Sequence, residues 1–404
     1  MRLGYKSTQA GAIPEDWDVK PLHQISTVVR GGSPRPAGDL RYFNGSYIPW
    51  LTVAALTNIP ASQLVVSETA TGLTQEGSLH SRTLTAGTPI IANSGATLGV
   101  AKILGIKCCA NDGIAALLDV SEHVSPHYLV HYINTKTSYL RDTVATGNGQ
   151  PNLNTGLIGN IRVPLPPTRA EQEAIAAALS DADSLIESLE QLLAKNQDIK
   201  QGAMQELLTG KKRLPGFSEE WGIKQLGSVL KFQVGFPFSS SFFNEDGQGL
   251  RLVKNHDLKS DDQMFYYSGK YEPAYLVRNG DVLVGMDGEF LPCLWAKGLA
   301  LLNQRVGRVV PLNGLNRVFA FYHLIEPLHE IESTTSGTTV KHLSHGDVEG
   351  IERPLPSVEE QTAIAEVLTD MDAKIAVLHE ELRKASNLKQ GMMQELLTGR
   401  IRLV

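Results

Sequence analysis

The sequence predicts an α+β protein in which two mixed α/β domains are separated by two long helices that form an antiparallel coiled coil. Three observations predict this class. A block of 43 residues occurs twice, both copies have the heptad pattern of a helix–helix seam, and the segments between the blocks contain short β-type runs broken by turn residues. The chain therefore has a pseudo-two-fold internal repeat.

The repeated block is the clearest of these signals. Gln172–Leu214 aligns without gaps on Gln361–Leu403, with 23 identities in 43 positions. The ends are nearly identical, KQGAMQELLTGKKRL against KQGMMQELLTGRIRL, and each block is entered by Pro-Leu-Pro and then a Glu-Gln pair. We interpret this as a duplication. It divides the chain into a first domain, a first helix, a second domain and a second helix, at residues 1–163, 164–214, 215–353 and 354–404.

Each block has the apolar spacing of a long helix. The steps alternate between four and three residues, which is the a/d pattern of a coiled-coil seam. The glycines at 210 and 399 occur where such helices are expected to stop. About 40 helical residues give a rod of roughly 60 Å, and antiparallel pairing would set the domains at opposite ends. The seam residues are Ile175, Leu179, Ala182, Ile186, Leu189 and Leu193, then Ile364, Leu368, Met371, Ile375, Leu378 and Leu382.

Between the blocks, the chain has diverged. A few anchors recur, such as Trp17 with Trp221 and Gly31 with Gly235. Short apolar runs at 47–51, 88–92 and 282–284 predict strands, interspersed with helical stretches. We expect two compact mixed domains of about 140 residues each, with no prediction of their strand order.

Composition and charge narrow the function classes. The chain is 42% hydrophobic and 20% charged, as in globular proteins, and has no apolar run that could span a membrane. Its start lacks the apolar region of a secretory signal. Its three cysteines cannot form a disulfide framework and have no metal-type spacing, and we therefore expect a reduced, cytoplasmic protein. The net charge of −6 is not that of a typical nucleic-acid binder, so a tight DNA complex would need partners to neutralise phosphates.

The whole chain resembles the specificity subunit of type I restriction–modification enzymes. The residues that carry this resemblance are the acidic pair with Trp that opens each domain, the PLP…EQ entry and MQELLTG, each found twice. The resemblance implies two target recognition domains, each reading one half of a bipartite site in double-stranded DNA. It also implies two methyltransferase subunits that dock on the helices and methylate adenine with S-adenosylmethionine, and restriction/translocase subunits that use ATP and Mg. This chain itself would bind no cofactor.

The repeat supports this arrangement independently. Two nearly identical helical blocks predict two copies of one partner, and two diverged domains predict an asymmetric target. The chain ends in TGRIRLV and starts with a segment containing PEDW, which together imitate TGKKRLPGFSEEW at the middle junction. We therefore expect the two ends of the chain to lie within about 20 Å of each other.

No catalytic or metal-binding motif is present. The sequence lacks the methyltransferase Asn/Asp-Pro-Pro-aromatic motif, a phosphate-binding loop and an HExxH pair. Three alternatives stay open. The chain could be the recognition subunit of a related restriction system that cuts on both sides of its site. It could also be an enzyme with an unrecognised active site, or a coiled-coil adaptor, although the adaptor leaves the two diverged domains unexplained.

DNA reading requires polar or basic side chains on loops that reach base edges. For each such residue, an ordinary turn or solvated role is about as common as a base contact, and more so for histidine. The candidates are Arg35, Asn93, Ser94, Asn148, Gln150 and Asn152 in the first domain and Lys254, Asn255, His256 and Lys341 in the second.

Docking of partner subunits is expected at residues shared by both blocks. The alternative is that these residues match because both helices pack in the same way, and the two interpretations can both hold. The candidates are Gln172, Gln201, Gln205, Glu206, Gln361, Gln390, Gln394 and Glu395.

Overall fold

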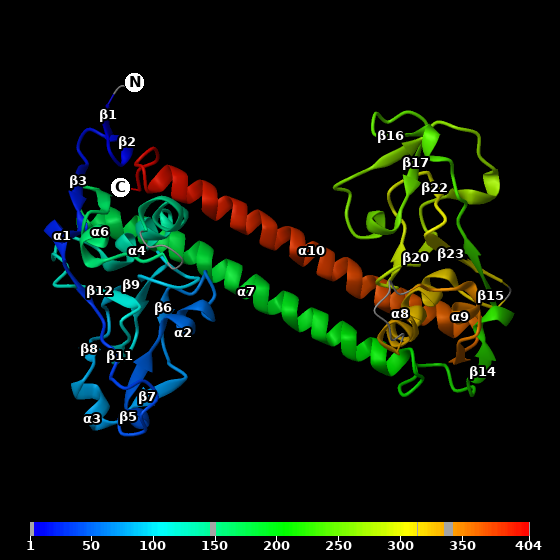
Figure 1. The fold of residues 1–404 in the computed structure, drawn as a ribbon, viewed down its shortest axis with the longest axis horizontal. Helices are drawn as coiled ribbons and strands as arrows, with labels where there is room; N and C mark the ends of the chain where they lie inside the picture. The colour runs from blue at the N-terminus through cyan, green and yellow to red at the C-terminus, as the bar shows by residue number, and fades with distance from the viewer. Residues whose placement is uncertain (1–3, 146–150, 313, 335–341, 404) are drawn as a thin grey trace. The chain divides into compact units, whose positions relative to one another are not determined.

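The computed structural model describes residues 4–145, 151–312, 314–334 and 342–403. The chain divides into two compact units. Unit 1 comprises Met1–Leu193 and Leu378–Val404, and unit 2 comprises Ala194–Val377. Each unit contains one predicted mixed domain, the beginning of the long helix that follows it and the end of the other long helix (Figure 1).

The domain of unit 1 contains two sheets of mixed direction. Within them, β10 pairs parallel with β6 and β11 pairs parallel with β5, and the other neighbours are antiparallel. In sheet order the strands are β4 (Thr27–Arg30), β12 (Ile114–Leu118), β9 (Pro89–Ala92), β10 (Ala101–Leu104) and β6 (Val65–Val66), then β7 (Thr71–Leu73), β5 (Phe43–Leu51), β11 (Cys108–Ala110) and β8 (Arg82–Leu84).

The domain of unit 2 also contains two sheets. Its one parallel pair among the named strands is β17 with β22. In sheet order the strands are β15 (Leu230–Val234), β23 (Val306–Pro311), β20 (Val282–Gly285) and β21 (Pro292–Leu294), then β16 (Phe243–Asn244), β18 (Phe265–Tyr267), β17 (Leu250–Val253), β22 (Ala300–Leu302) and β19 (Leu276–Val277).

The two domains share one topology, although their sequences have diverged. The order β4-β12-β9-β10 corresponds to β15-β23-β20-β21, and β7-β5-β11-β8 corresponds to β18-β17-β22-β19. The parallel pair β5–β11 has its counterpart in β17–β22. The internal repeat therefore includes the domains as well as the helices.

Other elements connect each domain to its helices. In unit 1 these are α4 (Pro126–Asn134), α6 (Thr155–Gly159) and the pair β3 (Asp18–Pro21) with β13 (Arg162–Leu165). In unit 2 they are α8 (Arg317–Thr334), α9 (His345–Glu349) and β14 (Gly222–Gln225) with β24 (Glu352–Leu355). The remaining elements are β1 (Tyr5–Thr8), β2 (Gly11–Pro14), α1 (Leu22–Ile25), α2 (Val53–Thr57), α3 (Gln75–Leu79), α5 (Thr137–Tyr139), η1 (Leu140–Val144), η2 (Leu226–Ser228), η3 (Ser240–Phe242), η4 (Asn255–Leu258) and η5 (Pro273–Tyr275).

The two long helices are α7 (Arg169–Leu207) and α10 (Val358–Leu396), each 39 residues. The predicted seam residues nearest the helix starts are almost completely buried, at 0% for Ile175 and Leu179 and 1% for Ile364. Two glycines, Gly210 and Gly399, follow the helices with φ values of 71° and 69°. This left-handed backbone favours glycine and ends the helix where the sequence predicts.

Within each unit, α7 and α10 run in opposite directions. In unit 1, Lys389 of α10 forms an ion pair with Asp183, near the start of α7. In unit 2, Lys200 near the end of α7 forms the corresponding pair with Asp372 of α10, at 2.5 Å. The repeat offset of 189 residues relates both members of the two pairs, so the duplicated sequence makes the same contact twice.

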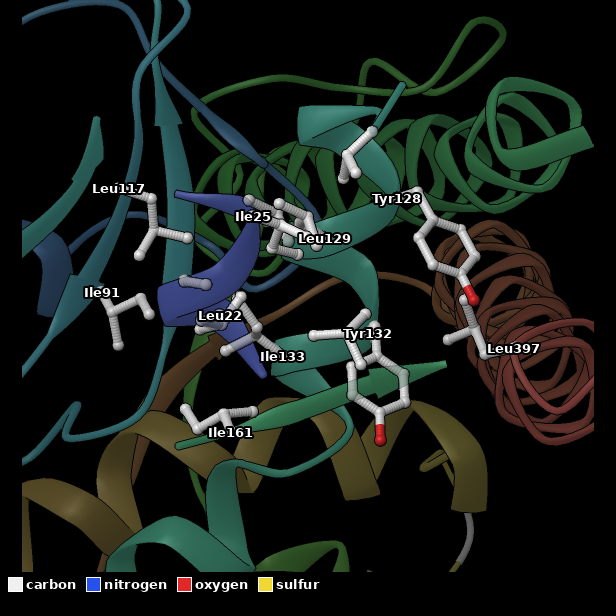
Figure 2. Packing of buried hydrophobic residues seen from close by; sticks show 14 of the residues in the cluster. Leu22, Ile25, Ile91, Leu117, Tyr128, Leu129, Tyr132, Ile133, Ile161 and Leu397 are labelled. Atoms are coloured by element: carbon white, nitrogen blue, oxygen red, sulfur yellow. The ribbon is translucent and has the colours of Figure 1, made fainter. Parts of the chain in front are cut away.

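The core of unit 1 joins its domain to these helices. In Figure 2, Leu22 and Ile25 of α1 and Leu129 of α4 belong to the same cluster as Leu397, which directly follows α10. The hydroxyl of Tyr128, also in α4, donates a hydrogen bond to the carbonyl oxygen of Pro164 at 2.7 Å. Burial raises the pKa of Tyr128 well above its ordinary value.

The segments near the two ends of the chain meet in unit 1, as predicted. The Tyr5 hydroxyl donates to the carbonyl oxygen of Gly399 at 2.9 Å, and Arg402 pairs with Asp16 at 3.1 Å. The residues near the two ends thus form a junction that corresponds to the one between α7 and β14 in the middle of the chain.

Two histidines are buried, and burial lowers the pKa of both. His131 is 1% exposed and His323 is 5% exposed. Burial first, then Lys389 and His127, lowers the pKa of His131 to about 3. Burial first, then Arg353, lowers the pKa of His323 to about 4.

These groups bind protons in the unfolded chain below pH ~6.5 but stay neutral in the folded protein, so stability falls as pH drops from ~6.5 towards the folded pKa. We expect each histidine to cost about 2 kcal/mol between pH 7 and pH 5. Urea unfolding of His323→Gln at both pH values should show a smaller acid loss than the parent. The exposed His329→Gln is the control, and an equal acid loss in the His323 variant would contradict the assignment.

Candidate DNA interface

In unit 1, several loop residues predicted to read DNA gather around Asp112, in the turn between β11 and β12. The Asp112 carboxylate accepts hydrogen bonds from Ser33 Oγ at 2.7 Å and from Arg35 Nη2 at 3.4 Å. Its carbonyl oxygen accepts from Asn93 Nδ2 at 3.2 Å. We name this group the Asp112 cluster; it contains Ser33, Arg35, Asn93, Asp112 and the bridged pair Ser94 and Asn152.

Asn93 has a structural role in this cluster. Its side chain is 2% exposed. Its backbone N–H donates to Gly113 at 2.9 Å, and its carbonyl oxygen accepts from Leu153 at 2.8 Å. Asn93 therefore supports the loop in this structure, and its contact with DNA stays a prediction. Arg35, by contrast, has a side chain that is 72% exposed.

In unit 2, a corresponding group surrounds Asp287, just after β20. The Asp287 carboxylate pairs with Arg305 Nη1 at 3.0 Å and with His342 Nδ1 at 2.9 Å. Its carbonyl oxygen accepts from Asn255 Nδ2 at 2.6 Å. We name these four residues the Asp287 cluster. The Arg305 and His342 side chains are both more than half exposed.

The two clusters occupy equivalent places in the shared topology. Asn93 donates to the carbonyl of Gly113, and Met286 donates to the carbonyl of Arg305 at 3.1 Å. The bridges Ser94–Asn152 and Asp287–His342 also correspond. Three positions therefore match in backbone but differ in chemistry: Ser94 with Asp287, Gly113 with Arg305, and Asn152 with His342.

The other predicted DNA residues are less directly placed. Lys254 Nζ lies 3.0 Å from the centroid of the Phe265 ring, and burial lowers its pKa. His256 Nε2 is 2.7 Å from the carbonyl oxygen of Gln263. The residues Asn148, Gln150 and Lys341 lie outside the described part of the chain.

Sequence reasoning missed the three residues that organise these clusters, Asp112, Asp287 and Arg305. A signal for Asp112 exists, because Asn111-Asp112-Gly113 separates two apolar runs and so marks a turn. The contribution of Arg305 could not be inferred in this way, because its partner Asp287 is 18 residues away in another strand connection.

A second pair of equivalent sites lies where the domains meet the long helices. In unit 2, the buried Glu360 accepts from Arg213 Nε and Nη2 at 2.7 and 2.6 Å and from Trp221 Nε1 at 3.0 Å. In unit 1, Arg402 forms the corresponding ion pair with Glu171, which is 1% exposed. Its guanidinium lies 5.8 Å from the Trp17 ring centroid.

Gln172 and Gln361 are buried where a domain meets a long helix. They are 2% and 0% exposed. Gln172 Oε1 accepts from the backbone N–H of Ser125, the residue before α4, and Gln361 Oε1 accepts from Asn316, the residue before α8, at 2.9 and 2.8 Å. Their amide nitrogens donate to the carbonyls of Pro166 and Pro356. Both glutamines fix a domain helix to the start of a long helix, which supports the packing interpretation, and docking by these two residues stays a prediction.

The other six docking candidates keep exposed or half-exposed side chains near the ends of α7 and α10. Two of the glutamates form local ion pairs, Glu206 with Lys212 at 3.5 Å and Glu395 with Arg400 at 3.2 Å. The repeat thus places similar polar surfaces at both helix ends. The six residues are Gln201, Gln205, Glu206, Gln390, Gln394 and Glu395.

Neither a metal site nor a membrane span is found in the described ranges. No helix there is long and apolar enough to cross a bilayer. No group of three or more His, Cys, Asp or Glu side chains in those ranges could hold a metal ion.

Both halves of the chain are similar to proteins of one family. The family model for the type I restriction modification DNA specificity domain matches twice, at residues 14–198 and 218–386. The chain is 26% identical over 427 aligned positions to the type I restriction enzyme MjaVIII specificity subunit of Methanocaldococcus jannaschii, covering 99% of this chain and 96% of that protein. It is 34% identical over 188 positions to the EcoBI specificity subunit of Escherichia coli, covering 45% and 40%.

Two solved structures have the same fold. The S subunit of a type I restriction-modification system from M. genitalium superposes with a TM-score of 0.63 at 14% identity, covering 94% of this chain and 96% of that one. A chain from a study of type I R-M complex assembly and conformational transition gives 0.57 at 19% identity, covering 96% and 99%.

Proposed function

The chain belongs to the family of type I restriction modification DNA specificity domains, and we propose that it is the specificity subunit of a type I restriction–modification complex. Each of its two domains reads one half of a bipartite target. The observation that carries this proposal is the pair of equivalent loop clusters, around Asp112 and Asp287, which share a backbone arrangement but present different side chains. Different chemistry on one scaffold fits two different half-sites, and hence an asymmetric target.

In this proposal, α7 and α10 form one antiparallel coiled coil that sets the spacing between the half-sites. Two observations support this. The helices have a heptad seam, and the repeated ion pairs Lys389–Asp183 and Lys200–Asp372 join the start of one helix to the end of the other within each unit. The length of the coiled coil then determines how many base pairs separate the two halves.

In this proposal, the partner subunits carry out catalysis. Two methyltransferase subunits dock on the two helix ends through the six exposed polar residues, and restriction/translocase subunits join them. S-adenosylmethionine, ATP and Mg bind to those partners. The duplicated helix surface supports two copies of the same subunit, because a partner that fits Gln201–Gly210 also fits Gln390–Gly399.

An insertion in both helices tests the proposal. Seven residues added between Leu193 and Ala194, and seven between Val377 and Leu378, preserve the heptad phase at the boundary between the units. About 10 Å of added helix corresponds to about three base pairs. Adenine-methylation mapping of the assembled complex should show unchanged half-sites and a longer spacer. An insertion in α7 alone is the control, and it should abolish specific methylation. If the variant with both insertions recognised different bases in its half-sites, the spacer role would be contradicted.

A further inference from the structure

We propose that each domain reads a guanine through an arginine that a carboxylate holds in place: Arg35, held by Asp112, and Arg305, held by Asp287. This inference rests on the proposed function and identifies bases within the two half-sites. It also separates residues that discriminate between sequences from those that only support the loops.

Both arginines are exposed, and each contacts its carboxylate through one nitrogen of the guanidinium. Arg35 contacts the Asp112 carboxylate through Nη2, at 3.4 Å, and its side chain is 72% exposed. Arg305 contacts the Asp287 carboxylate through Nη1, at 3.0 Å, and its side chain is 56% exposed. In each pair the contact with the carboxylate uses one terminal nitrogen, and more than half of the arginine side chain is exposed.

Arg41 shows the contrasting arrangement. It is also exposed and paired with an aspartate, but Asp39 takes up both Nε and Nη2 at distances of 2.7 to 3.2 Å. That pairing occupies the Nε–Nη2 edge of the fork. Arg41 is the matched control, because it has the same charge in the same domain and pairs with an aspartate outside the Asp112 cluster.

The second argument is position. Asp112 and Arg305 occupy neighbouring positions of the same turn, between β11 and β12 in unit 1 and between β22 and β23 in unit 2. In unit 1 the turn supplies the carboxylate and the loop after β4 supplies the arginine. In unit 2 the turn supplies the arginine and the segment after β20 supplies the carboxylate. Two unlike sequences thus place an arginine–aspartate pair at the same site.

The chemistry of an arginine fork specifies the base. Guanine presents two acceptors, O6 and N7, on its major-groove edge, and a guanidinium can donate to both at once. The contact with the carboxylate restricts the orientations that the fork adopts before binding, which reduces the conformational freedom lost on binding. A phosphate contact does not require such an orientation, since a flexible lysine serves equally well.

The test uses the complex assembled with its methyltransferase subunits. Arg35→Lys and Arg305→Lys keep the charge but lose the fork. Each should relax one guanine position by roughly 10- to 100-fold in the methylation motif, and the two variants should affect different half-sites. Arg41→Lys should leave the motif unchanged. Uniform weakening on all sequences, with a smaller salt dependence, would identify phosphate contacts and overturn the proposal, as would an unchanged motif in both variants.

A second measurement does not depend on how the variants fold. With the parent complex, a duplex in which 7-deazaguanine replaces one guanine at a time should bind more weakly at one position in each half-site, because N7 is missing. If no 7-deazaguanine substitution reduces affinity, arginine does not read guanine, although the chain still specifies the site. If the parent complex has no sequence-specific binding at all, the proposed function itself is wrong.

Discussion

A chain in which residues 17–163 replace residues 221–353 is expected to direct methylation to a symmetric site. Two copies of the first domain must read the same half-site, and the duplicated helices pair in opposite directions within each unit, so the half-sites should be inverted copies. The exchanged segments begin and end at equivalent positions. Trp17 corresponds to Trp221, and Val163 in β13 corresponds to Arg353 in β24. The new motif should retain the first half of the parent motif and lose the second entirely.

Methylation mapping of the assembled complex measures this change, and the parent complex is the control. If the duplicated chain still specified the original second half-site, recognition would not reside in residues 221–353. If it specified a continuous site, the two domains would not act as separate readers.

Replacing Glu360 with alanine should remove about 3–5 kcal/mol from the free energy of unfolding of unit 2. The Glu360 side chain is 2% exposed and accepts two hydrogen bonds from Arg213 and one from Trp221. Its removal leaves a guanidinium and an indole N–H without their acceptor in a largely buried site. The equivalent Glu171→Ala should have a similar effect on unit 1, where Arg402 is the partner.

Urea unfolding followed by tryptophan fluorescence provides the measurement. Glu359→Ala is the matched control, because Glu359 is adjacent in α10 but exposed. Its effect should stay within about 0.5 kcal/mol. An equally small loss for Glu360→Ala would mean that the junction does not hold the domain to the helices.

The sequence was most informative where its signals were local and repeated. The heptads of Ile175 and Ile364 and the glycines at 210 and 399 predict both long helices with their ends, because helix periodicity and termination depend on near neighbours. The duplication also predicts that the chain ends meet, which the Tyr5–Gly399 contact confirms. The common topology of the domains was not predictable, because strand pairing depends on contacts distant in sequence.

The candidate site was only partly predictable for the same reason. Loop position suggested both Arg35 and Asn93, but the exposure of a loop residue depends on the packing around it, and Asn93 is 2% exposed. Gln172 and Gln361 recur in both blocks because both tie a domain helix to a long helix. Similarity between the repeats therefore identified residues with a shared role without showing whether that role was packing or docking.

The most direct test of the central claim is to map methylated adenines in cells that express the methyltransferase partners with and without this chain. We predict one asymmetric, bipartite motif that is present with the chain and absent without it. The same motif in cells without the chain would contradict the account, because specificity would then belong to the partners.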